Sequence, residues 1–142
     1  MNKLTLAVLY SDGTISSEYD SSKKVVAVVS NGTYVGLKNT IKTGWKTVRS
    51  ICERIGTKVY YGYLPLISTL EQWHRDIDNI NTTLRELKEL GVNAEEFCKA
   101  DTYWSCSESS VGEAKAISFP LGNVSTVVHT MPCYGRAAIE LC

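Results

Sequence analysis

Hydrophobic and polar residues alternate near the start of the chain in the pattern that strands require. Aliphatic residues stand at every second position of the stretch Leu4–Val8, and a second apolar run ends at Asn31-Gly32. Both residues of that pair tolerate the positive φ that a type I′ turn demands. The pattern therefore predicts an antiparallel hairpin with strands over 25–30 and 33–37.

The middle of the chain carries apolar residues at helical spacing instead. We predict a first helix over about 44–55 with a buried face formed by Trp45, Val48, Cys52 and Ile55. The longest pattern runs from Leu70 to Leu87 in steps of three and four. Weak helix formers over 78–83 interrupt it, so we expect two helices packed on the domain's own sheet, not one coiled-coil rod.

Three signals mark where these helices should begin and end. Ser68 and Glu71 have the spacing of a capping box at the start of the second helix. Gly91 follows the last apolar step and predicts a left-handed stop. Asn93 and Glu96 repeat the capping-box spacing, which predicts one more short helical turn.

Strand character surrounds this helical region. The segments with strand character are 60–64, 103–104, 114–119, 124–129 and 134–141. The order along the chain is β-rich, helix, helix, β-rich, with no internal repeat or low-complexity linker. The sequence therefore predicts a single α+β domain over residues 1–142.

Composition narrows the range of partners. The 142 residues include 15 Lys+Arg and 15 Asp+Glu, so the formal net charge at pH 7 is zero. A nucleic-acid or anionic-membrane binder concentrates basic residues, so we expect neither a nucleic-acid partner nor membrane insertion. The apolar run in Met1–Tyr10 is too short for a secretory signal, which predicts a protein made in the cytoplasm.

The cysteines and histidines give no motif typical of a catalytic or metal site. The chain has five cysteines and none forms a CxxC pair, so we expect structural, reduced thiols, with one disulfide or an interchain bond as the alternative. Cys106, among serines, is expected to be the most exposed of them. His74 and His129 lack a second ligand at metal-binding spacing, so we assign them structural or surface roles. The sequence predicts no metal and no cofactor.

Acidic residues in the second half leave two interpretations open. Asp101, Glu95, Glu96, Glu108 and Glu113 have the ligand type of a calcium site or a pair of glycosidase carboxylates. They also fall in expected loops and helix ends, where solvated charges are common. We favour the second interpretation, because only the fold decides whether two carboxylates reach the separation that catalysis needs.

Four motifs in order resemble one known family. They are Leu64-Pro65 with Leu70-Glu71, Tyr103-Trp104-Ser105-Cys106-Ser107-Glu108, Ala114 to Phe119 with Gly122, and Arg136-Ala137-Ala138-Ile139. Together they resemble the Fib-succ-major type of C-type-lectin-like domain, found in bacterial and phage surface proteins, including those of crAss-like phages of Bacteroides-type hosts. The resemblance implies twisted antiparallel sheets with two to three helices. Lys115 and Cys106 depart from the family pattern, and the calcium-dependent sugar motifs of true C-type lectins are missing.

The resemblance also implies roles for individual residues. The signature positions implied to build the scaffold are Leu64, Pro65, Glu71, Tyr103, Trp104, Phe119, Gly122 and Arg136. Arg136 is expected to bond backbone carbonyls or Glu108. The implied binding surface is loop-rich and covers 101–113, 120–123 and 130–135. The binding residues that we predict on it are Ser107, Glu108, Glu113, Asn123 and Tyr134.

These observations lead to one expected function and two alternatives. We expect a non-enzymatic virion structural protein: a head fibre, capsid decoration or host-surface adhesin on the virion exterior. Its expected partners are other virion structural proteins, further copies of itself, and a host surface glycan or protein. A first strand that begins directly at Met1 is expected to be an unpaired edge that adds to a neighbour's sheet. The alternatives are a bacterial cell-surface binding domain and a cysteine enzyme related to formylglycine-generating proteins.

Overall fold

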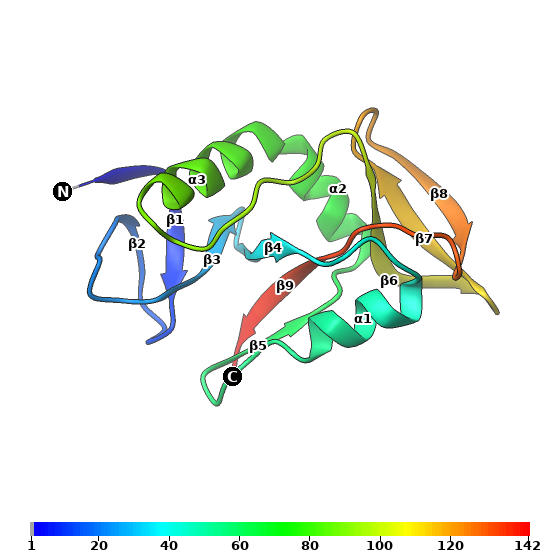
Figure 1. The fold of residues 1–142 in the computed structure, drawn as a ribbon, viewed down its shortest axis with the longest axis horizontal. Coiled ribbons are helices and arrows are strands. Elements are labelled where there is room, and N and C mark those ends of the chain that lie inside the picture. The colour runs from blue at the N-terminus through cyan, green and yellow to red at the C-terminus, as the bar shows by residue number, and fades with distance from the viewer. Residues whose placement is uncertain (1) are drawn as a thin grey trace.

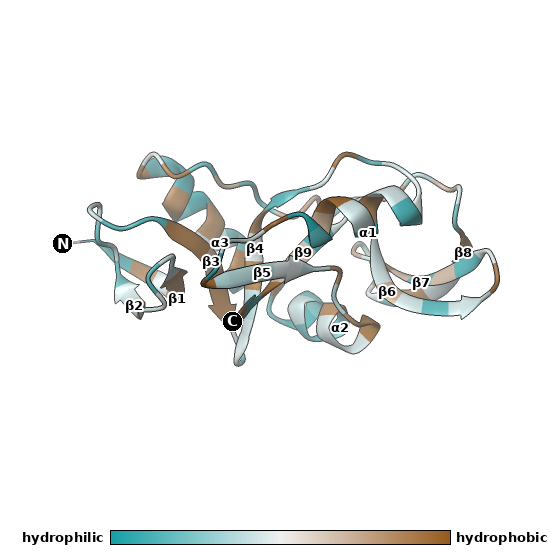
Figure 2. Cartoon of the chain, turned by 90° about the horizontal axis from the view of Figure 1, so that it is seen from below, coloured by the Kyte–Doolittle hydropathy of each residue, from teal (hydrophilic) through white to brown (hydrophobic). Residues whose placement is uncertain are grey.

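Two antiparallel sheets and three helices make up residues 2–142, the part of the chain that this computed structural model describes. The large sheet has the spatial order β2 (Ile15–Glu18), β1 (Lys3–Tyr10), β3 (Val25–Ser30), β4 (Thr33–Asn39), β9 (Arg136–Leu141) and β5 (Tyr60–Tyr63). The small sheet contains β6 (Thr102–Ser110), β7 (Glu113–Ser118) and β8 (Asn123–Val128). It lies at the end of the molecule away from β1 and β2 (Figures 1 and 2). The predicted α+β class is confirmed.

The predicted hairpin is confirmed as β3 and β4. Ser30 pairs with Thr33, which leaves Asn31 and Gly32 as a two-residue loop. Their φ angles are 48° and 79°, and both are positive as a type I′ turn requires. Local sequence therefore sets the register of this strand pair.

The first predicted helix forms as α1 (Trp45–Glu53). Trp45, Val48 and Cys52 are buried as expected. The prediction for Ile55 is wrong, because the helix ends before it and the side chain is 39% exposed. The backbone carbonyl of Ile55 instead accepts a hydrogen bond from the Gly62 N–H of β5, at 2.8 Å.

The long apolar stripe is divided between α2 (Ile67–Arg75) and α3 (Ile77–Glu89), which confirms two helices. The break falls at Asp76, earlier than the weak helix formers indicated. Asp76 accepts hydrogen bonds from Ser30 Oγ at 2.8 Å and from Asn79 Nδ2 at 2.9 Å. Asn81, a weak helix former, lies buried inside α3, where both polar atoms of its side chain bond the backbone of Phe97.

Both predicted capping boxes are wrong, whereas the predicted stop is confirmed. Helix α2 already begins at Ile67 after an N-cap at Leu66, which leaves Ser68 and Glu71 inside the helix. The segment 93–98 forms no helical turn. Gly91 has a φ of 92°, the left-handed conformation that ends α3.

A buried polar cluster ties the last strand to the rest of the fold. The Arg136 guanidinium donates to Gly36 O at 3.0 Å, Glu95 O at 2.7 Å and Asn39 Oδ1 at 2.9 Å. Asn39 Oδ1 also accepts the Tyr103 hydroxyl at 2.7 Å. The predicted bonds to backbone carbonyls are confirmed, and the Glu108 alternative is wrong. Burial lowers the pKa of Arg136 to about 10 and raises the pKa of Tyr103 to about 12.

The first strand is not the open edge that we expected. Strand β1 lies between β2 and β3, although only its last three residues, Val8 to Tyr10, pair with β3. In its first half, the N–H groups of Thr5 and Leu6 donate to Glu86 Oε1 and Thr83 Oγ1 of α3. The expected start of the strand at Met1 lies outside the described residues.

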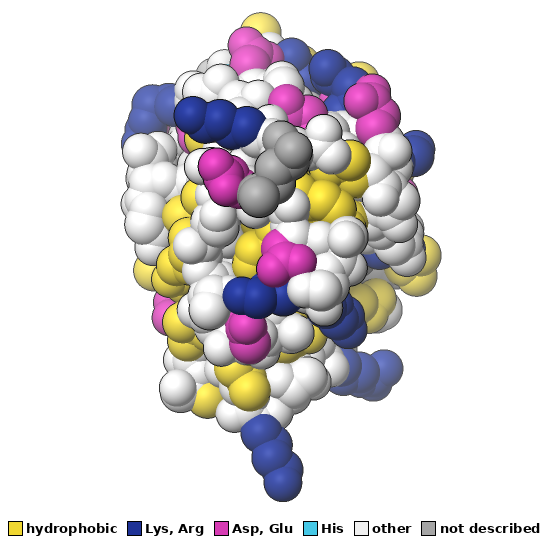
Figure 3. All heavy atoms as spheres, turned by 90° about the vertical axis from the view of Figure 1, so that its left-hand side faces the viewer, with side chains coloured by type: hydrophobic (Ala, Val, Ile, Leu, Met, Phe, Trp, Pro, Cys, Tyr) yellow, Lys and Arg dark blue, Asp and Glu magenta, His cyan; other side chains and the backbone are white. Residues whose placement is uncertain are grey.

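The surface of the described residues mixes charges of both signs. Figure 3 shows basic and acidic side chains interspersed on the face at the β1–β2 end. Figure 2 shows the hydrophobic residues concentrated on inner strands such as β3 and on one side of the helices. Within residues 2–142, no helix is both long and apolar enough to cross a membrane.

Candidate functional site

The small sheet has an open edge at β8. All six residues of β8 pair with β7, from Asn123 opposite Ser118 to Val128 opposite Glu113. No other strand in the described range pairs with β8, which forms the outer edge of the sheet (Figure 1). In an antiparallel ladder, alternate residues direct their N–H and C=O groups away from the paired neighbour, so β8 presents unpaired backbone groups to a partner.

The opposite edge of the same sheet is covered along Thr102–Cys106 of β6. Along β6, the N–H of Trp104 donates to Tyr134 O at 2.9 Å, and the N–H of Cys106 donates to Pro65 O at 2.8 Å. Tyr134 in turn donates its N–H to Thr102 O at 3.0 Å. The chain therefore covers one edge of the small sheet with its own segments and leaves the other free.

Edges of the large sheet are also protected. Strand β5 is bonded by the preceding loop, where Thr57 N–H donates to Tyr60 O at 2.7 Å. Strand β2 is only four residues long and ends in the charged residue Glu18. Short or covered edges are common devices against unwanted pairing. Strand β8 uses none of these devices.

The residues of β8 suit pairing with another strand. Its sequence, NVSTVV, contains β-branched residues and no charge, proline or glycine. All of its side chains are exposed except the half-buried Val127, and Val124 and Val128 are 39% and 47% exposed. Lysine, proline and bulges normally discourage pairing at an edge. The pairing of β7 with β8 runs through the whole strand without a register shift.

Glu108 lies at one end of the small sheet, beside a stacked aromatic pair. Its Oε2 is 3.4 Å from His129 Nε2, a contact that becomes an ion pair when the imidazole is protonated. The His129 ring stacks on Trp45 with 4.3 Å between centroids. Trp45 Nε1 donates to Ser105 O at 2.7 Å, and the Arg49 guanidinium lies 5.4 Å from the Trp45 ring centroid.

A cavity of about 320 Å³ opens next to this cluster. It is lined by Trp45, Arg49, Glu53, Tyr63, Leu64, Cys106 and Glu108. Arg49 and Glu53 form an ion pair at 3.0 Å across one turn of α1. Burial, and to a smaller extent the nearby Glu140 carboxylate, raises the pKa of the Tyr63 hydroxyl to about 12. The cavity therefore combines an aromatic wall with charges of both signs.

The predicted binding residues divide between the two ends of the small sheet. Glu108 and Glu113 lie near the β6–β7 turn, where Glu113 accepts a hydrogen bond from Ser110 Oγ at 2.9 Å. Asn123 lies at the other end, opposite Ser118. Ser118 is five residue steps along the strand from Glu113, which corresponds to about 17 Å. The structure does not bring these residues into one cluster.

Ser107 and Tyr134 have structural contacts in the described fold. Ser107 Oγ accepts the N–H of Ile67 at 3.4 Å, the first helical residue of α2. This tertiary contact explains why α2 begins without the predicted capping box. The half-buried ring of Tyr134 lies 5.6 Å from the Tyr103 ring, between centroids, and 5.8 Å from Lys42 Nζ.

The remaining signature residues hold the other end of the small sheet. Trp104 is fully buried, and its Nε1 donates to Thr43 O at 3.0 Å. Phe119 is buried, and its carbonyl bonds His74 Nε2 at 3.0 Å. Gly122 has a φ of 74°, and a Cβ at this position would lie 2.6 Å from His74 Cε1. Glycine therefore satisfies both the backbone conformation and the space beside His74.

The acidic residues are engaged separately. Asp101 pairs with Lys42 at 2.7 Å, and Glu96 pairs with Arg85 at 2.9 Å. The Lys42 hydrogen bond lowers the pKa of Asp101. Glu95 accepts a hydrogen bond from the Asn39 N–H at 3.2 Å. Within residues 2–142, no three histidine, cysteine or carboxylate side chains converge as metal ligands.

Our prediction for the exposure of the cysteines is corrected. Among the described residues all five cysteines are free, and Cys142 rather than Cys106 is the exposed one. Cys106 is half-buried beneath the cavity next to Glu108, and burial raises the pKa of its thiol. Burial also raises the pKa of Cys52 to about 12 and that of Cys133 to about 11.

Sequence reasoning missed three features of this region. The free edge of β8 depends on which strands pair, and the residue types of β8 do not show whether its outer edge has a neighbour. The stacking of His129 on Trp45 joins segments that are far apart in the chain. Asn39, which links Tyr103 to Arg136, has no sequence signal beyond its position at the end of a strand.

The sequence matches no known protein family and no curated protein.

Proposed function

We propose that this chain is a non-enzymatic structural protein of a phage particle, built on a C-type-lectin-like scaffold and displayed on the particle exterior. The two antiparallel sheets and three helices of the described residues agree with the architecture that the sequence resemblance implies. Tyr103, Trp104 and Arg136, three signature residues, are fully buried where strands β6 and β9 meet the rest of the fold. These observations support a scaffold that holds its surface elements in fixed positions.

The open edge of β8 is the observation that carries this proposal. A structural protein of a particle must hold a neighbour, and an unpaired strand edge offers a row of backbone donors and acceptors for that purpose. The occupant that we assign is an extended, uncharged segment of another particle protein, because β8 itself carries no charge. Valine and threonine side chains on β8 pack against β-branched residues of such a segment.

The two ends of the small sheet give this contact its selectivity. His129 follows β8 at one end, where the Glu108 carboxylate of β6 lies 3.4 Å from its Nε2, and Asn123 begins β8 at the other. Main-chain hydrogen bonds supply affinity in strand addition, whereas the side chains around the edge decide which partner fits. A contact of this kind does not use the N-terminal strand, which lies inside the large sheet between β2 and β3.

Particles produced by the genome that encodes this chain test the proposal. Thr126→Lys places a charge on the open edge of β8, and Ile15→Lys places the same charge on an exposed position of β2. We expect wild type and Ile15→Lys to be present in purified particles by mass spectrometry. We expect Thr126→Lys to be depleted at least about tenfold, because a charge opposes pairing at an edge.

Several outcomes would overturn the proposal. A wild-type chain found in infected cells and absent from mature particles would refute the particle role. Incorporation of Thr126→Lys equal to that of wild type would refute the β8 contact. Labelling of the chain at the surface of a bacterial cell would favour the cell-surface alternative. Thermal unfolding of both purified variants controls for loss of folding.

A further inference from the structure

The large sheet splits between β3 and β4. These strands pair only from Ala27 opposite Gly36 to the hairpin turn, so Val26 and Leu37 beyond this point have no ladder between them. The register of β3 against β1 also shifts at this level, where Val26 is the extra residue of a bulge. The two halves of the sheet therefore diverge and leave a wedge-shaped space.

A cavity of about 470 Å³ fills this wedge. Its lining comes from strands β3, β4, β5 and β9 and from the three loops that contain Lys24, Ile55 and Val92. Val26, Ile139 and the ring of Tyr60 belong to one apolar cluster on this side of the sheet. Ile55, which the helical pattern placed in the core, instead lies 39% exposed on the cavity lining.

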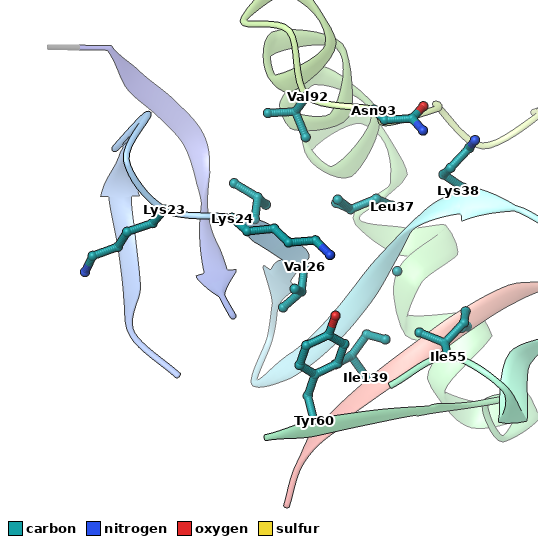
Figure 4. Close-up of a pocket in the computed structure, with 13 residues that line it drawn as sticks. Lys23, Lys24, Val26, Leu37, Lys38, Ile55, Tyr60, Val92, Asn93 and Ile139 are labelled. Atoms are coloured by element: carbon teal, nitrogen blue, oxygen red, sulfur yellow. The ribbon is translucent and has the colours of Figure 1, made fainter. Parts of the chain in front are cut away.

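The charged side chains around the cavity are all lysines. Figure 4 shows the Lys24 side chain extending across the opening toward the Tyr60 hydroxyl, with Lys38 beside Asn93 on the other side. Lys23 points away from the cavity and pairs with Asp12 at 3.3 Å. Among the described residues, no carboxylate lines the cavity. The electrostatic potential in the cavity is therefore positive, even though the net charge of the whole chain is zero.

We propose that this cavity binds a small amphipathic anion, with an apolar body in the wedge and a carboxylate between Lys24 and Lys38. The volume falls in the range of small-molecule sites, and an apolar lining with a few polar groups is their usual composition. The hydrophobic body packs on Val26, Leu37 and Ile139. The Tyr60 hydroxyl adds a neutral donor to the carboxylate.

This inference is independent of the particle contact at β8. The cavity lies in the large sheet, and none of its lining residues belongs to the small sheet. Loss of one site leaves the other intact, so the two proposals fail separately.

Decanoate is a suitable probe, because it combines a ten-carbon body with one carboxylate. We expect it to bind the purified chain in isothermal titration and to shift the NMR signals of Val26 and Ile139. Decanol lacks the charge and acetate lacks the apolar body, so both bind at least about fivefold more weakly. Decyltrimethylammonium tests the sign of the charge, and binding as tight as that of decanoate would overturn the proposal.

Three variants locate the anion and the apolar body. Lys24→Gln combined with Lys38→Gln changes two exposed side chains and is expected to weaken decanoate binding at least about fivefold. Lys115→Gln removes an exposed lysine of the small sheet and is the matched control, with unchanged binding. Ile55→Trp narrows the cavity at an exposed residue and is expected to weaken decanoate and decanol alike. Wild-type affinity in the double variant, or shifts away from the wedge, would refute the site.

Discussion

Replacement of Arg136 by methionine tests the buried polar cluster that joins the last strand to β4 and to the segment that contains Glu95. The guanidinium is fully buried, and its three hydrogen bonds reach Gly36, Asn39 and Glu95. It also lies 4.3 Å from the centroid of the Phe97 ring. Methionine has a similar length and no donors, so the variant removes these bonds without leaving a large cavity.

Two opposing effects determine the size of the loss. The carbonyls of Gly36 and Glu95 each lose a buried donor, at a cost of about 1–3 kcal/mol per acceptor. Asn39 Oδ1 still accepts the hydrogen bond from the Tyr103 hydroxyl, so the loss of the Arg136 donor costs less at this acceptor. Methionine also removes the cost of burying the guanidinium charge, which the lowered pKa of Arg136 indicates, and this offsets part of the loss. We expect a net loss of about 3 kcal/mol in the free energy of unfolding.

Urea denaturation of Arg136→Met and Arg136→Lys measures this difference, with Arg85→Met as the matched control. Arg85 pairs with Glu96 at the surface, where its side chain is 55% exposed, so its removal costs less than about 1 kcal/mol. Lysine retains the charge of Arg136 but lacks the planar guanidinium with its fixed set of N–H donors. Arg136→Lys therefore recovers only part of the lost free energy of unfolding. An Arg136→Met variant within about 0.5 kcal/mol of wild type would refute the reasoning.

The pH dependence provides a second check on Arg136. Burial lowers the pKa of Arg136 to about 10 in the folded chain, so the unfolded chain binds more protons than the folded chain only above about pH 10. The contribution of Arg136 to stability therefore rises as the pH rises through about 10 and is constant well below it. We expect the difference between wild type and Arg136→Met to be constant from about pH 5 to 9. A slope in that range would contradict the assignment.

Three further predictions concern individual side chains. Iodoacetamide at about pH 8 should modify the exposed Cys142 first and Cys52 last, because Cys52 is buried with a pKa raised to about 12; peptide mass spectrometry measures the order. Gly122→Ala should cost about 1 kcal/mol more in urea denaturation than Gly112→Ala, because both glycines have positive φ but only Gly122 faces His74; equal costs would contradict the contact. Asp76→Ala should lower the free energy of unfolding by about 1–2 kcal/mol through the lost bonds to Ser30 Oγ and Asn79 Nδ2, and an unchanged urea midpoint would argue against that role.

Local patterns predicted several elements well because their causes are local. The Asn31-Gly32 turn forms as expected, since positive φ is a property of these two residues. Gly91 ends α3 for the same reason. The predicted capping boxes failed because a hydrogen-bond partner from elsewhere replaced the local one. Ser107 supports the start of α2, and Asn81 holds the segment that contains Phe97.

The candidate surfaces depended on long-range pairing instead. Glu108 and Asn123 belong to one sheet, but the register of β7 against β8 places them at opposite ends. The open edge of β8 and the wedge beside Val26 both arise where a ladder is missing. Residue types do not show where a strand lacks a neighbour, because the same types of residue also occur in strands that are paired.

The sequence by itself determined the α+β class, the β3–β4 hairpin and the helical region. Each of these follows from the spacing of apolar residues or from the backbone preference of one or two residues. Tertiary structure alone decided the three partners of Arg136, the protection of β1, the free edge of β8 and the cavity in the large sheet. These features arise where segments distant in the chain meet, and their geometry depends on how all of the strands pair.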